Sequence, residues 1–177
     1  MAVQPMAANR EFTVADEHVY NHRSPTRWIV SHLLRYKTFL ASFITASAVT
    51  ALLFSSIPAL TGRAFDEVLA PEPDALRLLA LSLAILGVVL LRGLTDIINA
   101  FSIEVLGQRL ERDSRDELYI SLLGKSQTFH NRQRVGDVMA RATNDVRQLN
   151  PMMNPGVALI TDSVMGIIAP LIFITFL

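Results

Sequence analysis

Three long apolar runs, separated by polar segments, dominate the pattern of this chain. Residues 39–60 carry no charged side chain, and residues 156–177 carry only that of Asp162. A further apolar run starts at residue 75 and continues to about residue 100. A helix rises about 1.5 Å per residue, so each run is long enough to cross a hydrocarbon core of about 30 Å. The pattern predicts an all-α membrane protein with spans at about residues 38–60, 75–100 and 156–177.

The second helix is predicted to continue far beyond the bilayer. Residues 101–125 contain no proline, and a narrow apolar stripe follows one helical face, interrupted by Ser114 and formed by Leu106, Leu110, Leu118 and Leu122. A helix over residues 75–125 is about 75 Å long, which exceeds the bilayer core by about 45 Å. We therefore expect a long helical hairpin at about residues 101–155 that reaches a soluble partner.

Turns and breaks are placed by proline, glycine and aspartate. Pro71 and Pro73 block a helix, and a loop is expected over residues 61–74. The polar turn is expected at residues 126–136, and Gly136 and Asp137 at its end restart a helix, because a carboxylate is favoured at a helix N-terminus. Kinks are expected further on, at Pro151 and Pro155.

The N-terminal segment divides into a tail and a helix. Residues 1–24 are polar without periodicity or an apolar signal region, and we expect them to form a disordered cytoplasmic tail. Ser24 and Pro25 then suit the cap and the first position of a helix. Its apolar face would hold Trp28, Ile29, Leu33 and Leu34, with Arg27, Arg35 and Lys37 nearer the other side. Two interpretations remain open: a helix on the membrane surface, or a helical lead-in to the first span.

The distribution of basic residues predicts the orientation in the membrane. The first 37 residues contain five Lys or Arg and residues 101–155 contain eight, against one in residues 61–75. Basic residues favour the cytoplasmic side. The chain is therefore expected to be a multi-pass protein of the plasma (inner) membrane, with its N-terminus and residues 101–155 in the cytoplasm.

Composition excludes several classes of function. The net charge of zero gives no indication of nucleic-acid binding, and a chain without cysteine has neither disulfides nor thiolate zinc sites. The four histidines include no HxxxH pair. No catalytic, cofactor-binding or metal-binding residue is expected in the chain.

Several oppositely charged residues are spaced four apart on helices: Arg92 with Asp96, Glu111 with Arg115, Arg112 with Asp116, and Arg141 with Asp145. Such pairs contribute little at a surface. Ionisable residues inside spans are candidates for a substrate pathway, namely Arg92, Asp96 and Asp162. The alternative for Arg92 is that it reaches the headgroups and pairs with Asp96.

Two stretches resemble transporters of the ATP-binding cassette (ABC) family. At the end of the first span, Pro58, Gly62 and Asp66 are similar to a motif of ABC exporters. The stretch FHNRQRVGDVMARATNDV, residues 129–146, resembles their first intracellular loop, with Phe129, the pair Gly136-Asp137, Arg141 and Asp145 at the matching positions. The resemblance covers residues 27–177 and implies the first three spans of a six-span exporter transmembrane domain.

The resemblance also implies a mechanism and its partners. A short coupling helix containing Phe129, His130, Asn131 and Arg132 would contact a nucleotide-binding domain, and Gly136, Asp137, Arg141 and Asp145 would hold the hairpin. The family pattern shows two adjacent aromatics where this chain has Phe129-His130. ATP and magnesium belong to that other domain, since these 177 residues contain no G-x-x-x-x-G-K-[ST] phosphate loop. The chain alone should therefore hydrolyse no ATP.

The expected function is thus the transmembrane portion of an ATP-driven exporter, paired with an identical or different second half and embedded in lipid. The pattern does not identify the transported substrate. Two spans followed by a long charged helix also fit the input segment of a sensory receptor, and a small structural membrane protein is a third alternative.

Overall fold

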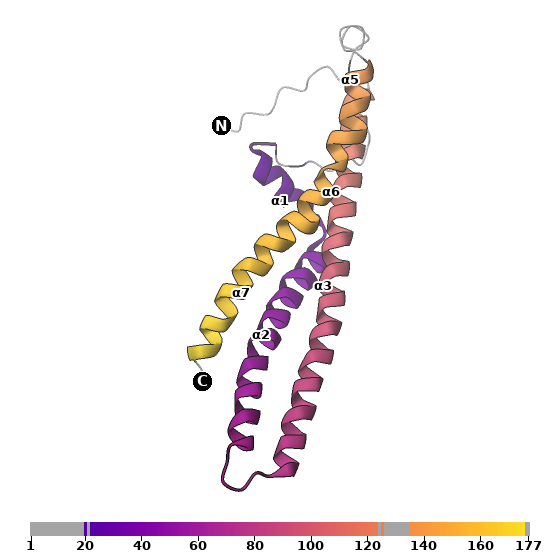
Figure 1. Ribbon diagram of the computed structural model, residues 1–177. Helices are drawn as coiled ribbons and strands as arrows, with labels where there is room; N and C mark the ends of the chain where they lie inside the picture. Colours follow the sequence, from indigo (N-terminus) through magenta and orange to yellow (C-terminus); the bar gives the residue numbers. More distant parts are fainter. Residues whose placement is uncertain (1–19, 21, 124, 126–134, 176–177) are drawn as a thin grey trace. The chain divides into compact units, whose positions relative to one another are not determined.

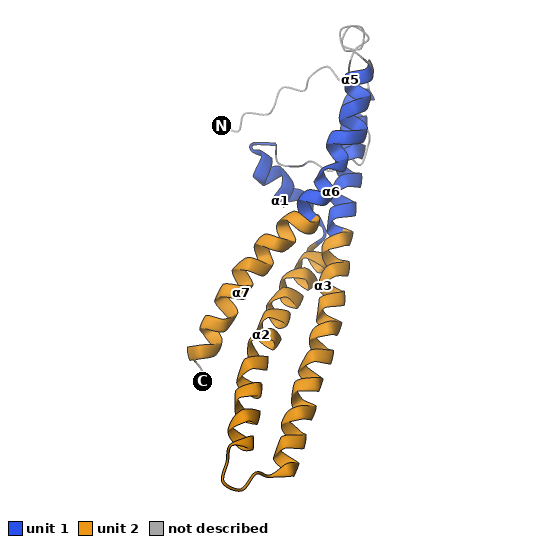
Figure 2. Ribbon diagram, in the orientation of Figure 1, with its two compact units in different colours: residues 1–36, 106–153 blue, residues 37–105, 154–177 orange. Residues whose placement is uncertain are grey.

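The computed structural model describes residues 20, 22–123, 125 and 135–175 (Figure 1). The regular elements over these residues are all helical, which confirms the predicted all-α class. The chain divides into two compact units (Figure 2). Unit 1 contains Met1–Tyr36 and Leu106–Met153, and unit 2 contains Lys37–Val105 and Asn154–Leu177. Each unit is described separately below.

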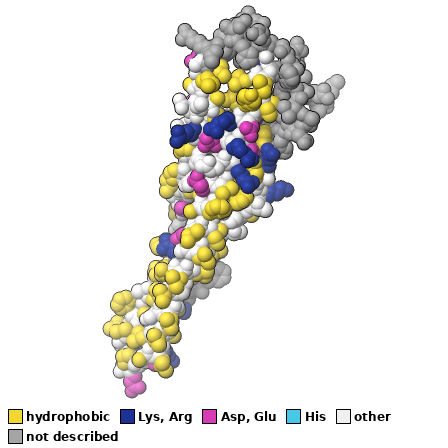
Figure 3. Space-filling view, turned by 90° about the vertical axis from the view of Figure 1, so that its right-hand side faces the viewer, with side chains coloured by type: hydrophobic (Ala, Val, Ile, Leu, Met, Phe, Trp, Pro, Cys, Tyr) yellow, Lys and Arg dark blue, Asp and Glu magenta, His cyan; other side chains and the backbone are white. Residues whose placement is uncertain are grey.

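Unit 2 contains the apolar helices. They are α2 (Lys37–Val68), the first part of α3 (Ala75–Leu123) and α7 (Ala158–Thr175), with α2 between the other two in Figure 1. Three helical stretches are long and apolar enough to cross a membrane, namely Lys37–Val68, Ala75–Leu123 and Gly136–Thr175. Many large apolar side chains of α2 and α3 are exposed, for example Phe54, Leu83 and Leu90, and hydrophobic side chains cover much of the lower part of the face shown in Figure 3. Such exposure suits a lipid environment.

Neutral polar side chains join α2 to α3 at three levels. The amide of Asn99 donates to the hydroxyl of Ser47 at 2.8 Å, and Ser102 donates to Ser42 at 2.9 Å. The hydroxyls of Thr50 and Thr95 lie 2.9 Å apart. Small hydroxyl residues allow membrane helices to approach closely and bond across the interface.

The boundary of the first loop differs from the prediction. The sequence placed a loop from residue 61, but α2 continues to Val68. Pro58 lies inside the helix, where it removes only one backbone donor. Residues 61–68 contain no further proline, and the break comes just before Pro71 and Pro73.

Unit 1 contains α1 (Pro25–Arg35), the second part of α3, α5 (Val135–Ala140), the π-helical turn η1 (Arg141–Asp145) and α6 (Leu149–Pro151). The single helix predicted over residues 75–125 is confirmed by α3. Its stripe is buried as expected at Leu106 and Leu110, each 1% exposed, and at Ser114. Gly107 permits a close approach, since a β-carbon there would lie 3.3 Å from Oδ1 of Asn150.

The two predicted kinks have different outcomes. At Pro155 the prediction is confirmed, because Asn154 leaves the helical conformation (φ −125°, ψ 106°) within the turn η2 (Met152–Val157). A residue before proline is driven toward extended backbone. At Pro151 the prediction is wrong: the backbone stays helical, and the amide of Met152 donates to the carbonyl of Gln148 at 3.1 Å.

At α1 the predicted cap is confirmed. The hydroxyl of Ser24 accepts from the amide of Arg27 at 3.3 Å, and Pro25 occupies the first position. The helix ends at Arg35, and Tyr36 (φ −108°, ψ 52°) separates it from α2. The N-terminal helix is therefore not continuous with the first apolar helix.

Candidate functional site

A polar cavity lies among the three apolar helices of unit 2. Its volume is about 450 Å³, and α2, α3 and α7 all contribute to its wall. Its polar lining residues are Ser47, Thr50, Arg92, Asp96, Asn99, Asn154 and Asp162. Apolar positions such as Phe54 and Ile103 complete the wall. A concave site of this size with a few polar groups is typical of ligand binding.

The α3 wall of the cavity carries an ion pair. Nε of Arg92 lies 3.6 Å from Oδ2 of Asp96, one helical turn further along, which confirms the predicted pairing. The guanidinium of Arg92 also lies over the ring of Phe54 on α2, 4.5 Å from the centroid. Nε of Arg92 is buried without a hydrogen bond within the described residues. Because a buried donor gains by finding an acceptor, Arg92 can turn to a ligand in the cavity.

The opposite wall is formed by α7 and the residues before it. Asp162 is exposed and makes no hydrogen bond or ion pair with any described residue. Asn154 donates to Oε2 of Glu104 at 2.8 Å. The three ionisable residues that the sequence nominated, Arg92, Asp96 and Asp162, therefore line one cavity. Their role as a substrate pathway remains a prediction.

This arrangement suits the binding of a ligand with both polar and apolar groups. One guanidinium and two carboxylates give the lining a formal charge of −1, and amides and hydroxyls supply neutral donors and acceptors. Over the described residues no cluster of His, Asp and Glu has the geometry of a metal site. The cavity therefore offers mixed polar and apolar contacts to an amphipathic ligand.

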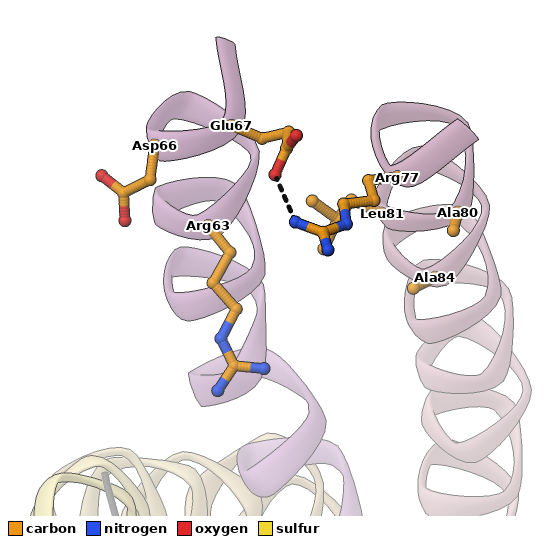
Figure 4. Close-up of a pocket in the computed structure, with 7 residues that line it drawn as sticks. All are labelled: Arg63, Asp66, Glu67, Arg77, Ala80, Leu81 and Ala84. Carbon is orange, nitrogen blue, oxygen red and sulfur yellow. Dashed lines mark ion pairs between the residues drawn. The ribbon is translucent and has the colours of Figure 1, made fainter. Parts of the chain in front are cut away.

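A second pocket of about 630 Å³ lies between the ends of α2 and α3 near their connecting loop (Figure 4). Arg77 on α3 points toward Glu67 on α2, with Nη1 3.7 Å from Oε2, while the side chain of Asp66 points away from α3. The motif residues Pro58, Gly62 and Asp66 all lie on α2 near this end.

The predicted hairpin residues fall into two groups. Phe129, His130, Asn131 and Arg132 lie outside the described residues. Gly136 and Asp137 lie in the first turn of α5, as expected for a helix start. Arg141 and Asp145 begin and end η1, where the amide of Val146 donates to the carbonyl of Arg141. Both side chains are exposed, and no ion pair joins them in the described part of the chain. The contact that their i,i+4 spacing predicted is therefore not formed there.

A polar contact that the sequence did not predict joins α1 to α3, and we call it the α1 clasp (Trp28, His32, Arg35, Tyr36, Asp113 and Glu117). Nε1 of Trp28 donates to Glu117 at 3.0 Å, and the hydroxyl of Tyr36 donates to Asp113 at 2.7 Å. Arg35, expected on the outer face, donates to Asp113 at 3.4 Å. Asp113 and Glu117 are one turn apart beside the apolar stripe. That spacing is the feature of the sequence from which the contact could have been predicted.

Burial and polar contacts shift the pKa values of two groups in the clasp, Glu117 and Tyr36. Burial opposes ionisation of Glu117, but the close contact with the His32 ring, the hydrogen bond from Trp28 and the nearby His22 ring outweigh it and lower the pKa of its carboxyl. Burial, the hydrogen bond to Asp113 and the Asp113 charge raise the pKa of the Tyr36 phenol. Arg112 also turns to Asp113, at 3.2 Å, and not to Asp116 as its spacing had predicted.

Comparison with known proteins places these features in a family. The profile of the ABC transporter transmembrane region matches residues 39–177. The chain is 29% identical over 133 residues to an "ATP-dependent lipid A-core flippase" of Syntrophus aciditrophicus, covering 75% of this chain and 21% of that protein. Proteins with the same description match at 28% over 123 residues in Chromobacterium violaceum and at 23% over 146 residues in Nitrosococcus oceani.

The latter two matches cover 70% and 81% of this chain, and 21% and 24% of the two relatives. The chain thus spans less than a quarter of the length of these relatives. The match extends through the apolar helices, the hairpin and the cavity residues, and it favours a transporter over the receptor and structural-protein alternatives. With three apolar helices long enough to cross a bilayer, the chain is an integral membrane protein that belongs to the ABC transporter transmembrane region family.

Proposed function

We propose that this chain forms the first three spans of an ATP-driven exporter and that its unit 2 cavity is part of the substrate path. The observation that carries the proposal is the convergence of Arg92, Asp96 and Asp162 from two helices on one cavity. Ionisable side chains inside a membrane segment are costly, and they usually face a functional interior.

An amphipathic, lipid-like molecule is the substrate class that we propose. The relatives are described as lipid A-core flippases, and the cavity combines an apolar wall with charged and amide groups. A headgroup would contact Arg92 and the neighbouring amides, while its hydrocarbon would lie along the apolar positions. Arg92 would exchange its loose contact with Asp96, at 3.6 Å, for the headgroup.

Coupling to ATP would occur through the turn at residues 126–136. Phe129, His130, Asn131 and Arg132 would contact a nucleotide-binding domain, which would hold ATP and magnesium. The continuous helix α3 supports this assignment, since its 49 residues are far more than the bilayer core requires. A second half, identical or different, would complete the path, with the N-terminus and the hairpin on the cytoplasmic side.

The test is transport by the complete transporter in proteoliposomes, with a fluorescent lipid A-core analogue as the probe. Asp162→Asn and Arg92→Gln should each lower transport about tenfold, equivalent to ~1.4 kcal/mol. Ser163→Ala is the matched control, because among the described residues its hydroxyl bonds only to the carbonyl of Leu159 in its own helix. Unchanged transport in both cavity variants would exclude this cavity from the path.

Coupling is tested separately with Phe129→Ala. Transport per ATP hydrolysed should fall while the membrane domain remains folded and inserted, because a partner contact is lost and not a hairpin contact. Unchanged coupling together with a clearly lowered melting temperature would show that Phe129 serves the hairpin.

A further inference from the structure

The pocket at the loop end of α2 and α3 is not part of the proposed transport path. Its volume is about 630 Å³, and it shares no lining residue with the polar cavity described above. One wall is apolar and is formed on α3 by Ala80, Leu81 and Ala84. The wall on α2 carries charged side chains. A pocket with one apolar and one charged wall suits an amphipathic ligand.

The pocket lies where α2 and α3 leave their uncharged runs. On α2 that run ends at Leu60, and Arg63 follows about 4.5 Å further along the helix. On α3 the uncharged run begins at Leu78, directly after Arg77. Both helices are long and apolar enough to cross a bilayer. This level of the helices is therefore the boundary between hydrocarbon and water, where lipid headgroups lie.

Glu67 and Arg77 satisfy each other at the end of the pocket nearest the loop (Figure 4). Nη1 of Arg77 lies 3.7 Å from Oε2 of Glu67, and Oε1 of Glu67 accepts from the backbone amide of Asp74 at 3.0 Å. The charge of Glu67 is thus matched within the chain. The charged lining residues that remain for a ligand are Arg63 and Asp66.

Arg63 is a cation without a protein acceptor. It is exposed and makes no hydrogen bond, ion pair or ring contact with any described residue. Its side chain extends along α2 away from Glu67, in the direction in which α3 runs from Arg77 to Ala84 (Figure 4). The guanidinium therefore points toward the uncharged runs, where it needs an anion to offset the loss of water. The phosphate of a lipid is the anion available at this level, and it matches the paired donors of a guanidinium.

Asp66 offers a second charge on the water side of Arg63. It is exposed and has no hydrogen bond or ion pair with any described residue, and its side chain points away from α3 (Figure 4). It lies three residues nearer the loop than Arg63. A purely anionic headgroup would be repelled by this carboxylate. A headgroup with an inner phosphate and an outer ammonium matches both charges.

We propose that this pocket binds a glycerophospholipid with a phosphoethanolamine headgroup. The phosphate pairs with Arg63, the primary ammonium donates to Asp66, and the acyl region lies against Leu81 and Ala84. A choline headgroup carries methyl groups in place of the N–H donors, so it can pair with Arg63 but cannot donate to Asp66. The bound lipid bridges α2 and α3 at their loop end, and its binding does not depend on the transport path proposed above.

The test measures lipid binding to the purified 177-residue chain in detergent micelles by native mass spectrometry. The probes are phosphatidylethanolamine and phosphatidylcholine with identical acyl chains. The unsubstituted chain should bind phosphatidylethanolamine about threefold more tightly, because only its ammonium can donate to an exposed carboxylate. Equal affinity for the two lipids overturns the proposal, and this comparison requires no substitution.

Variants assign the two contacts. Arg63→Gln should lower the affinity for both lipids about tenfold, because both present a phosphate. Asp66→Asn should lower only the affinity for phosphatidylethanolamine, to the value for phosphatidylcholine. Glu72→Gln is the matched control and should retain the preference, because Glu72 is an exposed carboxylate of the connecting loop that does not line the pocket. Unchanged binding in Arg63→Gln, or an unchanged preference in Asp66→Asn, would refute the proposal.

Discussion

In unit 2 the helices α2 and α3 are joined by neutral hydroxyl and amide side chains, whereas in unit 1 the helices α1 and α3 are joined by carboxylates with basic and aromatic partners. Ser42, Ser47 and Asn99 belong to the first kind of contact, and Asp113 and Glu117 to the second. The same helix α3 therefore carries both chemistries along its length.

The difference follows from the cost of desolvating charge. A neutral hydroxyl pair can be buried among membrane helices without charge separation, and such bonds are individually weak there, at about 0.6 kcal/mol. A carboxylate needs several donors or a counter-charge when it is buried. Asp113 meets that requirement with Tyr36, Arg35 and Arg112. The contacts of unit 1 should thus respond to pH and salt, whereas those of unit 2 should not.

The largest expected effect comes from the apolar stripe of unit 1. Leu110→Ala removes a side chain that is 1% exposed and leaves a cavity, so the free energy of unfolding of unit 1 should fall by about 2–5 kcal/mol. Leu90→Ala in unit 2, at a position that is 65% exposed, should change stability by less than about 0.5 kcal/mol. Hydrogen exchange of backbone amides measures both. Equal effects would remove the contrast in packing between the units.

A smaller loss is expected at the clasp. Asp113→Asn replaces a buried charged acceptor of three side chains, and unit 1 should lose about 1–3 kcal/mol by the same hydrogen-exchange measurement. Asp116→Asn, three residues along and exposed, serves as the control and should have little effect. High salt should weaken the clasp in the unsubstituted chain and leave the hydroxyl contacts of unit 2 unchanged.

Alkaline pH provides a third comparison. The pKa of Tyr36 is raised on folding, so its contribution is complete below the ordinary phenol value of about 10 and is lost as the pH rises through the folded value. Tyr36→Phe should reduce the loss of the contact between α1 and α3 at alkaline pH. Tyr20 should retain part of it, because burial raises the pKa of that phenol as well. The exposed Tyr119→Phe is the control, and an unchanged alkaline transition in Tyr36→Phe would contradict the assignment.

The smallest effect is expected between the membrane helices. Ser102→Ala removes the bond to Ser42 and should cost only about 0.6 kcal/mol. Ser82→Ala should cost less, because within the described part of the chain its hydroxyl bonds only to the carbonyl of Leu78 in its own helix. Steric-trap unfolding in nanodiscs can measure both. A loss of several kcal/mol for Ser102→Ala would mean that unit 2 depends on polar contacts as strongly as unit 1 does.

Local patterns in the sequence predicted the helices well, because each depends on neighbouring residues. The cap at Ser24, the length of α3 and the buried face of Leu106 and Leu110 all follow from periodicity and propensity. The end of α2 was placed too early, because the uncharged run ends at residue 60 although the helix continues through charged residues to Val68.

Contacts between residues that are far apart in the sequence could not be predicted from local patterns. Trp28 and Glu117 are 89 residues apart, and nothing local indicates that they meet. Arg92, Asp96 and Asp162 were each recognised by their charge in an apolar run, but their convergence on one cavity required the packing of α3 and α7 near α2. Arg112 pairs with Asp113 and not with Asp116, because Asp113 is a buried acceptor in the clasp. The i,i+4 spacing alone does not indicate such an acceptor.

The close approach at Gly107 also limits how this chain can vary. Every single-base change of a glycine codon that alters the residue adds atoms to the side chain. Alanine is the mildest of these, because its methyl group would meet only the flexible end of Asn150 at 3.3 Å, with the β-carbon of Met153 at 3.5 Å behind it. Longer side chains would add further atoms at a position where the β-carbon already lies within 3.5 Å of Asn150 and Met153. Among natural variants of this helix, position 107 should therefore favour glycine or alanine over larger residues.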